Sequence, residues 1–299
     1  EADSVVKRSW VALLLVAAVV GYVVWQRPAE PPPPPVPRKD VVVQYADGSK
    51  MWGTSGVQQR DAVVKRVFEE LAEASLREDS LRATGAVVRT TIEPRAQTVA
   101  AATLGRLVAP QRNLDAAATA IDPASGGVRV YLPGFDWRDD SAGAAQEPGP
   151  GLALAGGQNV VKAKVTALEV SATYATFAAG GVRRKPHLVA EVTTADGKTL
   201  HRADDRADLA YSKDIADQFT ARLQENPACN GVACAASSYS SPSEPGKIQH
   251  AWMAGYTPQL AVTVIVKSQP RYGEEQAGVS VDADLPGVVW REFLAELGR

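Results

Sequence analysis

The sequence predicts an α+β protein in which an antiparallel sheet is flanked by helices. One observation is a helical repeat over Asp61 to Arg77, where apolar residues recur every three or four positions between charges. The other is a pair of hairpin patterns. Residues 116–134 carry two strand-like runs around the turn sequence DPASGG, and residues 188–201 carry two more around an Asp-Gly turn. Hairpins pair neighbouring strands antiparallel, so hairpins mixed with helices favour this fold class.

The remaining elements follow in chain order. Residues 85–92 are rich in β-branched side chains and predict a strand, and Pro94 suits the first turn of a helix that runs to Val108. The patterns further predict a helix over Thr166 to Ala179, which ends at Gly180 and Gly181. A second helix is capped by Ser212 and has Ile215, Phe219 and Leu223 on one face. A strand from His250 to Val266 and a closing helix after Pro286 follow.

The N-terminal segment predicts a membrane anchor. Residues 9–26 contain no charge, and the run is close to the length that crosses a hydrocarbon core of about 30 Å. A tail at residues 1–8 precedes it. A cleavable signal peptide is the alternative, but its apolar run is usually shorter and no small-residue cleavage site follows here. Residues 27–40 form a proline-rich linker, which we expect to be extended; a ligand for a proline-reading domain is the alternative.

Cysteine content and charge limit the chemistry. Cys229 and Cys234 predict a short-loop disulfide in an extracytoplasmic domain, with two unpaired thiols as the alternative. Two cysteines without a nearby histidine cannot complete a structural zinc site, so we expect no metal, and nothing indicates a cofactor. The net charge of −2 and the lack of a dense basic patch argue against nucleic-acid binding. His187 and His250 are isolated, which indicates structural or surface roles.

Several ordered stretches resemble one enzyme family. They are TTIEPRAQTVA from Thr90, NLDAAATAIDPASGGVRVYLPG from Asn113, the long run from Val165 to Leu200, HAWMAGYTPQLAVTVIV from His250, and LPGVVWREFL from Leu285. In this order they are similar to the transpeptidase domain of class A penicillin-binding proteins, which cross-link peptidoglycan. YADGSKMWGTSGVQQR, from Tyr45, is similar to the stretch that opens the glycosyltransferase domain of that class. The resemblance implies a β-lactamase- and transpeptidase-like fold over residues 85–299, with 41–84 as a linker and helical lead-in.

The chain departs from the family in its chemistry. A family transpeptidase needs a serine in an S-x-x-K box, whose lysine takes the proton, and an S-x-N box on a helical subdomain. Where the first box is expected, residues 135–164 contain one serine, Ser141, followed three positions later by Ala144. The helical subdomain is largely deleted with the second box. The glycosyltransferase domain is also missing, since Arg60 leads directly into the helix that normally follows it.

The third family box, Lys-Thr-Gly, aligns with the serine-rich stretch AASSYSS. Ser237 stands in the position of the lysine, Ser238 in that of the threonine and Tyr239 in that of the glycine. A tyrosine in the glycine position adds bulk where a substrate backbone should approach closely. We expect this stretch to be a solvated polar loop.

Three hypotheses about function follow. The first is an inactive, membrane-anchored relative on the bacterial plasma membrane, with one span, an extracytoplasmic C-terminal domain, and peptidoglycan or wall-synthesis proteins as partners. The second is an active penicillin-binding D,D-transpeptidase or carboxypeptidase with displaced motifs. It would use Ser237, Ser238, Ser240 or Ser241, with Lys247 or His250 as base. The third is a decaying gene product without a selected role.

Two surface expectations complete this interpretation. Without the helical subdomain, the sheet face at Val128–Leu132 and Val262–Val266 is expected to lie open unless residues 138–164 or another chain cover it. Residues 183–185, Arg-Arg-Lys, are expected in a solvated turn, with contact to anionic wall polymers as the alternative.

Overall fold

The computed structural model describes residues 39–55, 59–111, 113–134, 166–240, 245–269 and 279–298. All of them lie in one compact unit that begins at Arg38. The predicted tail and anchor lie outside the described residues, as does most of the predicted linker. No helix in the described part of the chain has the length and apolar character of a membrane span.

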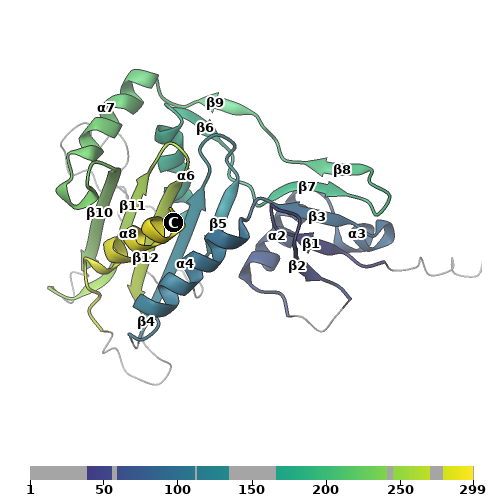
Figure 1. Ribbon diagram of the computed structural model, residues 1–299, viewed down its shortest axis with the longest axis horizontal. Helices are drawn as coiled ribbons and strands as arrows, with labels where there is room; N and C mark the ends of the chain where they lie inside the picture. Colours follow the sequence, from purple (N-terminus) through teal and green to yellow (C-terminus); the bar gives the residue numbers. More distant parts are fainter. Residues whose placement is uncertain are drawn as a thin grey trace, which may run out of the picture. The chain divides into compact units, whose positions relative to one another are not determined.

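The larger sheet has five antiparallel strands in the order β10-β11-β12-β4-β5 (Figure 1). The strands are β4 (Leu114–Ile121), β5 (Val128–Leu132), β10 (Ala233–Ser240), β11 (Ile248–Tyr256) and β12 (Ala261–Ser268). The predicted hairpin at residues 116–134 is therefore confirmed as β4 and β5. Its turn is held by Asp122, whose carboxylate accepts the Ala124 amide (2.8 Å), the Ser125 hydroxyl (2.9 Å) and the Arg129 guanidinium (2.6 Å). The hydrogen bonds from Arg129, Ala124 and Ser125 lower the pKa of Asp122, although burial opposes them.

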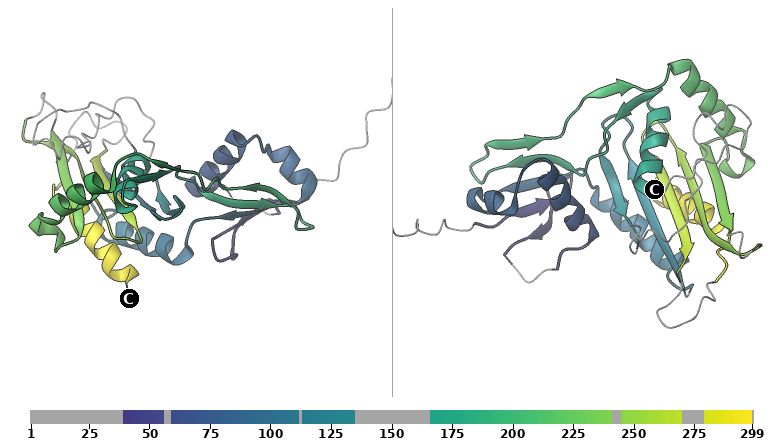
Figure 2. Two further views of the ribbon diagram at one scale, coloured as in Figure 1. Left: turned by 90° about the horizontal axis from the view of Figure 1, so that it is seen from above. Right: turned by 180° about the vertical axis from the view of Figure 1, so that it is seen from behind.

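Helices cover both faces of this sheet (Figures 1 and 2). Helices α4 (Pro94–Leu107) and α8 (Leu285–Leu297) pack on one face, and α6 (Ala167–Ala178) packs on the other. Side chains alternate between the faces along each strand, so Val130, Val262 and Val264 lie under α4 and α8 and are about 1% exposed. The prediction of an open face at these positions is wrong, because their side chains point toward these two helices.

A second sheet combines strands from the beginning and the middle of the described chain. Its order is β2-β1-β3-β7-β8, with β1 (Val42–Gln44), β2 (Lys50–Gly53), β3 (Val87–Thr90), β7 (Val189–Thr193) and β8 (Thr199–Arg202). The predicted hairpin at 188–201 is confirmed as β7 and β8. Strand β1 runs parallel to β3, so residues before and after position 85 build one sheet. Sequence patterns did not predict β1 and β2.

Helix α2 (Ala62–Glu73) begins at the cap residue Asp61, which accepts the Val64 amide at 2.8 Å. It ends four residues earlier than predicted. Ser75 adopts a left-handed φ of 63°, which ends the helix, and a separate α3 (Glu78–Thr84) follows. A third small sheet pairs β6 (Val182–Arg184) with β9 (Ala207–Leu209).

Two further expectations need correction. Helix α7 (Lys213–Gln224) has the predicted Ser212 cap, but its buried face is formed by Ala216, Phe219 and Leu223, while Ile215 is 38% exposed. The predicted strand from His250 to Val266 is two strands, because a turn closed by the Thr257 amide and the Leu260 carbonyl (2.9 Å) separates β11 from β12. The α+β class, with antiparallel pairing and flanking helices, is confirmed.

Candidate functional site

The serine-rich stretch forms strand β10 at the edge of the larger sheet. All eight of its residues pair antiparallel with β11, and the register shifts between Tyr239 and Ser240. The expectation of a solvated loop is therefore wrong. Alanine and serine have low strand propensity, and here the long partner strand β11 supplies the pairing that fixes the conformation.

Strand geometry separates the candidate nucleophiles. Ser237 lies opposite Trp252, whose side chain packs in the core cluster on the α6 side, and Ser238 lies opposite Ala251, which packs in the cluster under α8. Adjacent residues of a strand face opposite sides of the sheet. Ser237 and Ser238 therefore cannot share one general base, and the row of serines cannot act as one site.

The histidine considered as a base lies on the α6 side of the sheet. His250 is 7% exposed and pairs with Tyr239, so it faces the same side as Ser237 and the opposite side from Ser238. Ser237 and His250 are diagonal neighbours, a relation that separates residues by about 7–8 Å and their Cβ atoms by somewhat less. Ser241, also considered as a nucleophile, lies outside the described residues.

Helix α6 is fixed to the sheet by a buried hydroxyl cluster. Thr166 caps the helix in a reciprocal box with Glu169. The Ser171 hydroxyl lies 2.7 Å from that of Thr119 on β4 and donates to that of Thr263 on β12 at 2.9 Å. All three of these side chains belong to residues no more than 1% exposed. The cluster sets α6 in one position against the sheet centre, and the sequence pattern did not reveal it.

The two cysteines are paired. Cys229 ends the short helix η1 (Pro227–Cys229), and its disulfide with Cys234 ties that helix to the second residue of β10. Both cysteines are buried in the cluster under α8. The bond restrains the start of the serine-bearing strand and takes no part in binding a metal.

Nothing in the described part of the chain offers a metal site, since no group of three or more His, Cys, Asp or Glu side chains converges there.

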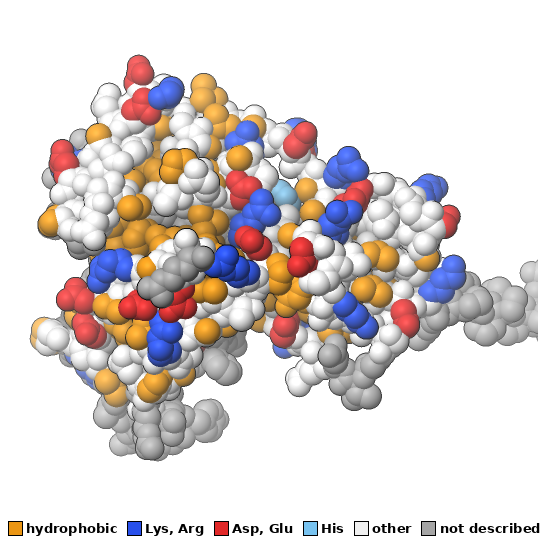
Figure 3. All heavy atoms as spheres, viewed as in Figure 1, with side chains coloured by type: hydrophobic (Ala, Val, Ile, Leu, Met, Phe, Trp, Pro, Cys, Tyr) orange, Lys and Arg blue, Asp and Glu red, His pale blue; other side chains and the backbone are white. Residues whose placement is uncertain are grey.

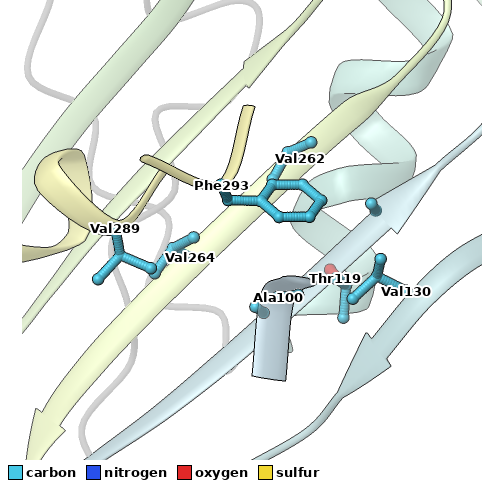
Figure 4. Close-up of a pocket in the computed structure, with 9 residues that line it drawn as sticks. Ala100, Thr119, Val130, Val262, Val264, Val289 and Phe293 are labelled. Carbon is cyan, nitrogen blue, oxygen red and sulfur yellow. The ribbon is translucent and has the colours of Figure 1, made fainter. Parts of the chain in front are cut away.

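Figure 4 shows a cavity between α4, α8 and the sheet, into which Val289 and Phe293 project. It measures about 10 Å³, roughly the space of one water molecule, and its lining is apolar. On the face in Figure 3, acidic and basic side chains are intermixed.

The remaining candidate residues take structural positions. The His187 ring nitrogen Nδ1 lies 3.2 Å from the Lys185 carbonyl, and the His187 backbone pairs with the β4–β5 turn. Arg183 and Arg184 belong to strand β6, so the expectation of a turn at residues 183–185 is wrong. Ser141 and Ala144 lie outside the described residues.

Comparison with known proteins identifies the fold. No family model matches the chain. Penicillin-binding protein 1A from Mycolicibacterium smegmatis is 31% identical over 150 residues, which are 47% of this chain and 18% of that protein. The chain thus spans about one fifth of the length of this relative. The structure of the penicillin-binding protein PonA1 from Mycobacterium tuberculosis matches with a TM-score of 0.63 and 20% identity, over 78% of this chain and 91% of that one.

The D,D-transpeptidase domain of a peptidoglycan glycosyltransferase from Eggerthella lenta matches with a TM-score of 0.57 and 13% identity, over 87% of this chain and 98% of that one. The chain has the transpeptidase-like fold of class A penicillin-binding proteins. The chain thus has a transpeptidase-like sheet with flanking helices, and its edge strand β10 carries Ser237, Ser238 and Tyr239.

Proposed function

We propose that this chain is a membrane-anchored, extracytoplasmic penicillin-binding-protein-like component of peptidoglycan assembly, which acts by binding or scaffolding rather than by transpeptidation. In this proposal residues 9–26 form the single span in the bacterial plasma membrane. Residues 27–40 hold the folded part away from the bilayer, 41–84 lead into the fold, and 85–299 form the transpeptidase-like domain.

The observation that carries the proposal is the division of the β10 serines between two faces of the sheet. A serine nucleophile needs a base within hydrogen-bond reach, about 2.6–3.2 Å. Ser238 lies on the face opposite His250, and Ser237 lies diagonally to it rather than directly opposite. Ser-Ser-Tyr also lacks the positive charge that a lysine would contribute at this position. These features support a strand that keeps its fold without the family's chemistry.

The sequence supports the same conclusion for the other boxes. The stretch at 135–164 has no lysine three positions after its serine, and it is too short to hold the family's helical subdomain. We infer that the S-x-x-K and S-x-N boxes and the glycosyltransferase domain are absent. The relatives are penicillin-binding proteins, so peptidoglycan or wall-synthesis proteins are the partners we propose.

A binding assay tests this role. The full chain, in nonionic detergent, is sedimented with purified peptidoglycan sacculi and, in parallel, with insoluble chitin as a polysaccharide control. It is also used as bait for detergent-solubilised wall-synthesis proteins from bacterial membranes. The proposal expects saturable retention on sacculi over chitin, or recovery of wall-synthesis proteins above a bait of unrelated fold. If the chain shows no preference for sacculi over chitin and recovers no wall-synthesis proteins above the control bait, the proposal is contradicted.

A further inference from the structure

A basic pocket lies between α6, β6 and β9, away from the serine-bearing strand. These three elements are neighbours in Figures 1 and 2, and α6 contacts β6. The cavity measures about 390 Å³, within the range of small-molecule sites. Its polar lining includes Thr173 and Thr176 of α6, Arg183 and Arg184 of β6, Lys185, and Tyr211.

Positive charge exceeds negative charge in this pocket. Asp208 supplies the one carboxylate among the described residues that line it. It lies 3.6 Å from the Arg183 guanidinium, and both side chains are mostly exposed, so this ion pair is weak. Within the described part of the chain, no ion pair joins Arg184 or Lys185 to a carboxylate. The nearby Asp204 pairs with Arg206 and also attracts Lys185 electrostatically. Among the residues that line the pocket, three cations and one carboxylate leave two positive charges in excess.

The cations are mounted on a rigid backbone. Strand β6 pairs with β9 on one side, with Arg183 opposite Asp208. On its other side it packs against the β4–β5 turn, where a Cβ added at Gly126 would lie 2.9 Å from the Lys185 carbonyl oxygen. Arg184 donates from Nη1 to the Pro123 carbonyl of that turn at 3.3 Å. Little conformational entropy is lost when Arg184, fixed by this bond, binds a ligand.

The other walls of the pocket contribute shape rather than charge. Thr173 and Thr176 donate their hydroxyl hydrogens to helix carbonyls, at 3.1 and 2.9 Å, so they are not available as donors to an anion. Tyr211 is held in a stack on Phe177, with ring centroids 5.0 Å apart. The positive charge that recognises a ligand in this pocket must therefore come from the two arginines and the lysine.

We propose that the basic pocket binds a phosphate group that carries close to two negative charges. A phosphate monoester has a charge of about −1.5 to −2 at pH 7, which matches the excess of two positive charges. Guanidinium forks match the oxygens of phosphate in a bidentate manner, and an ammonium group adds a point charge. This proposal does not depend on the loss of transpeptidase chemistry, because the pocket shares no residue with β10 or β11.

Calorimetric titration of the full chain with pyrophosphate tests the proposal, in nonionic detergent at low ionic strength. The test variant is Arg183→Gln with Lys185→Gln, two exposed positions. The matched control is Arg89→Gln with Arg202→Gln, which removes the same charge from the ion pairs of Glu191 on the second sheet. Thermal melts followed by circular dichroism verify that both variants are folded.

We expect the test variant to bind pyrophosphate at least tenfold more weakly than the unaltered chain, and the control to stay within twofold. We also expect binding to weaken as salt is raised, since the site is open to solvent. Equal loss in both variants, or no binding by the unaltered chain, would overturn the proposal. Equal binding of succinate, a dicarboxylate probe, would overturn the assignment to phosphate.

Discussion

Removal of the Ser171 hydroxyl probes how α6 is fixed to the sheet. In Ser171→Ala the chain loses the 2.9 Å bond to Thr263 and the 2.7 Å contact with Thr119. Thr119 keeps its bond to the Ala167 carbonyl, at 2.9 Å. For Thr263, the bond from Ser171 is the one hydrogen bond that its hydroxyl makes with the described residues, so the substitution leaves a fully buried hydroxyl unsatisfied.

The expected magnitude follows from these contacts. An unsatisfied buried hydroxyl costs about 1–3 kcal/mol, and a lost hydrogen bond about 1 kcal/mol. We therefore expect Ser171→Ala to lower the free energy of unfolding by about 2–3 kcal/mol. Thr263→Val should cost about 1 kcal/mol, because Ser171 then still bonds to Thr119. The double variant leaves no orphaned hydroxyl on Thr263, so its cost should fall about 1 kcal/mol below the sum of the two single costs.

Urea unfolding followed by circular dichroism measures the three variants. A constant slope with denaturant shows that the unfolded state is unchanged between them. The costs of Ser171→Ala and Thr263→Val should be non-additive, with a coupling free energy of about 1 kcal/mol between the two sites. Independent sites deviate from additivity by only roughly 0.3–0.5 kcal/mol. Additive costs within that margin, or a negligible effect of Ser171→Ala, would refute the role given to the hydroxyl cluster.

Three more predictions follow from the structure. Gly181→Ala should destabilise the fold strongly, because the φ of Gly181 is +90° and an added Cβ would clash with the Tyr211 carbonyl oxygen. Gly197→Ala is the control: Gly197 has a φ of +85° but open space around it, so the substitution should cost only about 1 kcal/mol in urea unfolding. Thiol titration should detect free Cys229 and Cys234 only after reduction, and reduction should lower stability by about 2 kcal/mol. The pKa of the Asp122 carboxyl is lowered in the folded state, so its stabilising contribution is present above the pKa that this carboxyl has in the unfolded chain. That contribution is lost as the pH falls through the pKa of Asp122 in the folded state. Acid unfolding curves of Asp122→Asn should therefore lack this loss of stability.

Local signals predicted much of this fold. The helix after Thr166 and the helix after Ser212 were both predictable, since cap residues and periodicity are encoded within a few positions. Strands β1 and β2 were not, because three- and four-residue strands gain stability from partners distant in sequence. Strand β10 was missed for a similar reason, as Ala and Ser favour no strand until β11 pairs with them.

The candidate site shows the same limit. The alignment of Ser237, Ser238 and Tyr239 with the third box came from the order of motifs, but the face of each side chain depends on the strand register. The shift of one residue between Ser237 and Ser238 places them on opposite sides of the sheet. Sequence spacing could not show this, because it did not predict a strand there.

Covalent labelling of the full chain by a fluorescent penicillin tests the central claim most directly. The chain, in nonionic detergent, is incubated with the reagent beside a penicillin-binding protein of known reactivity and a heat-denatured sample of itself. The account predicts no labelling above the denatured sample, and no change in Ser237→Ala or Ser238→Ala. Saturable labelling of the folded chain that is lost in one of these variants, or in Ser240→Ala or Ser241→Ala, would contradict it and establish an active serine enzyme.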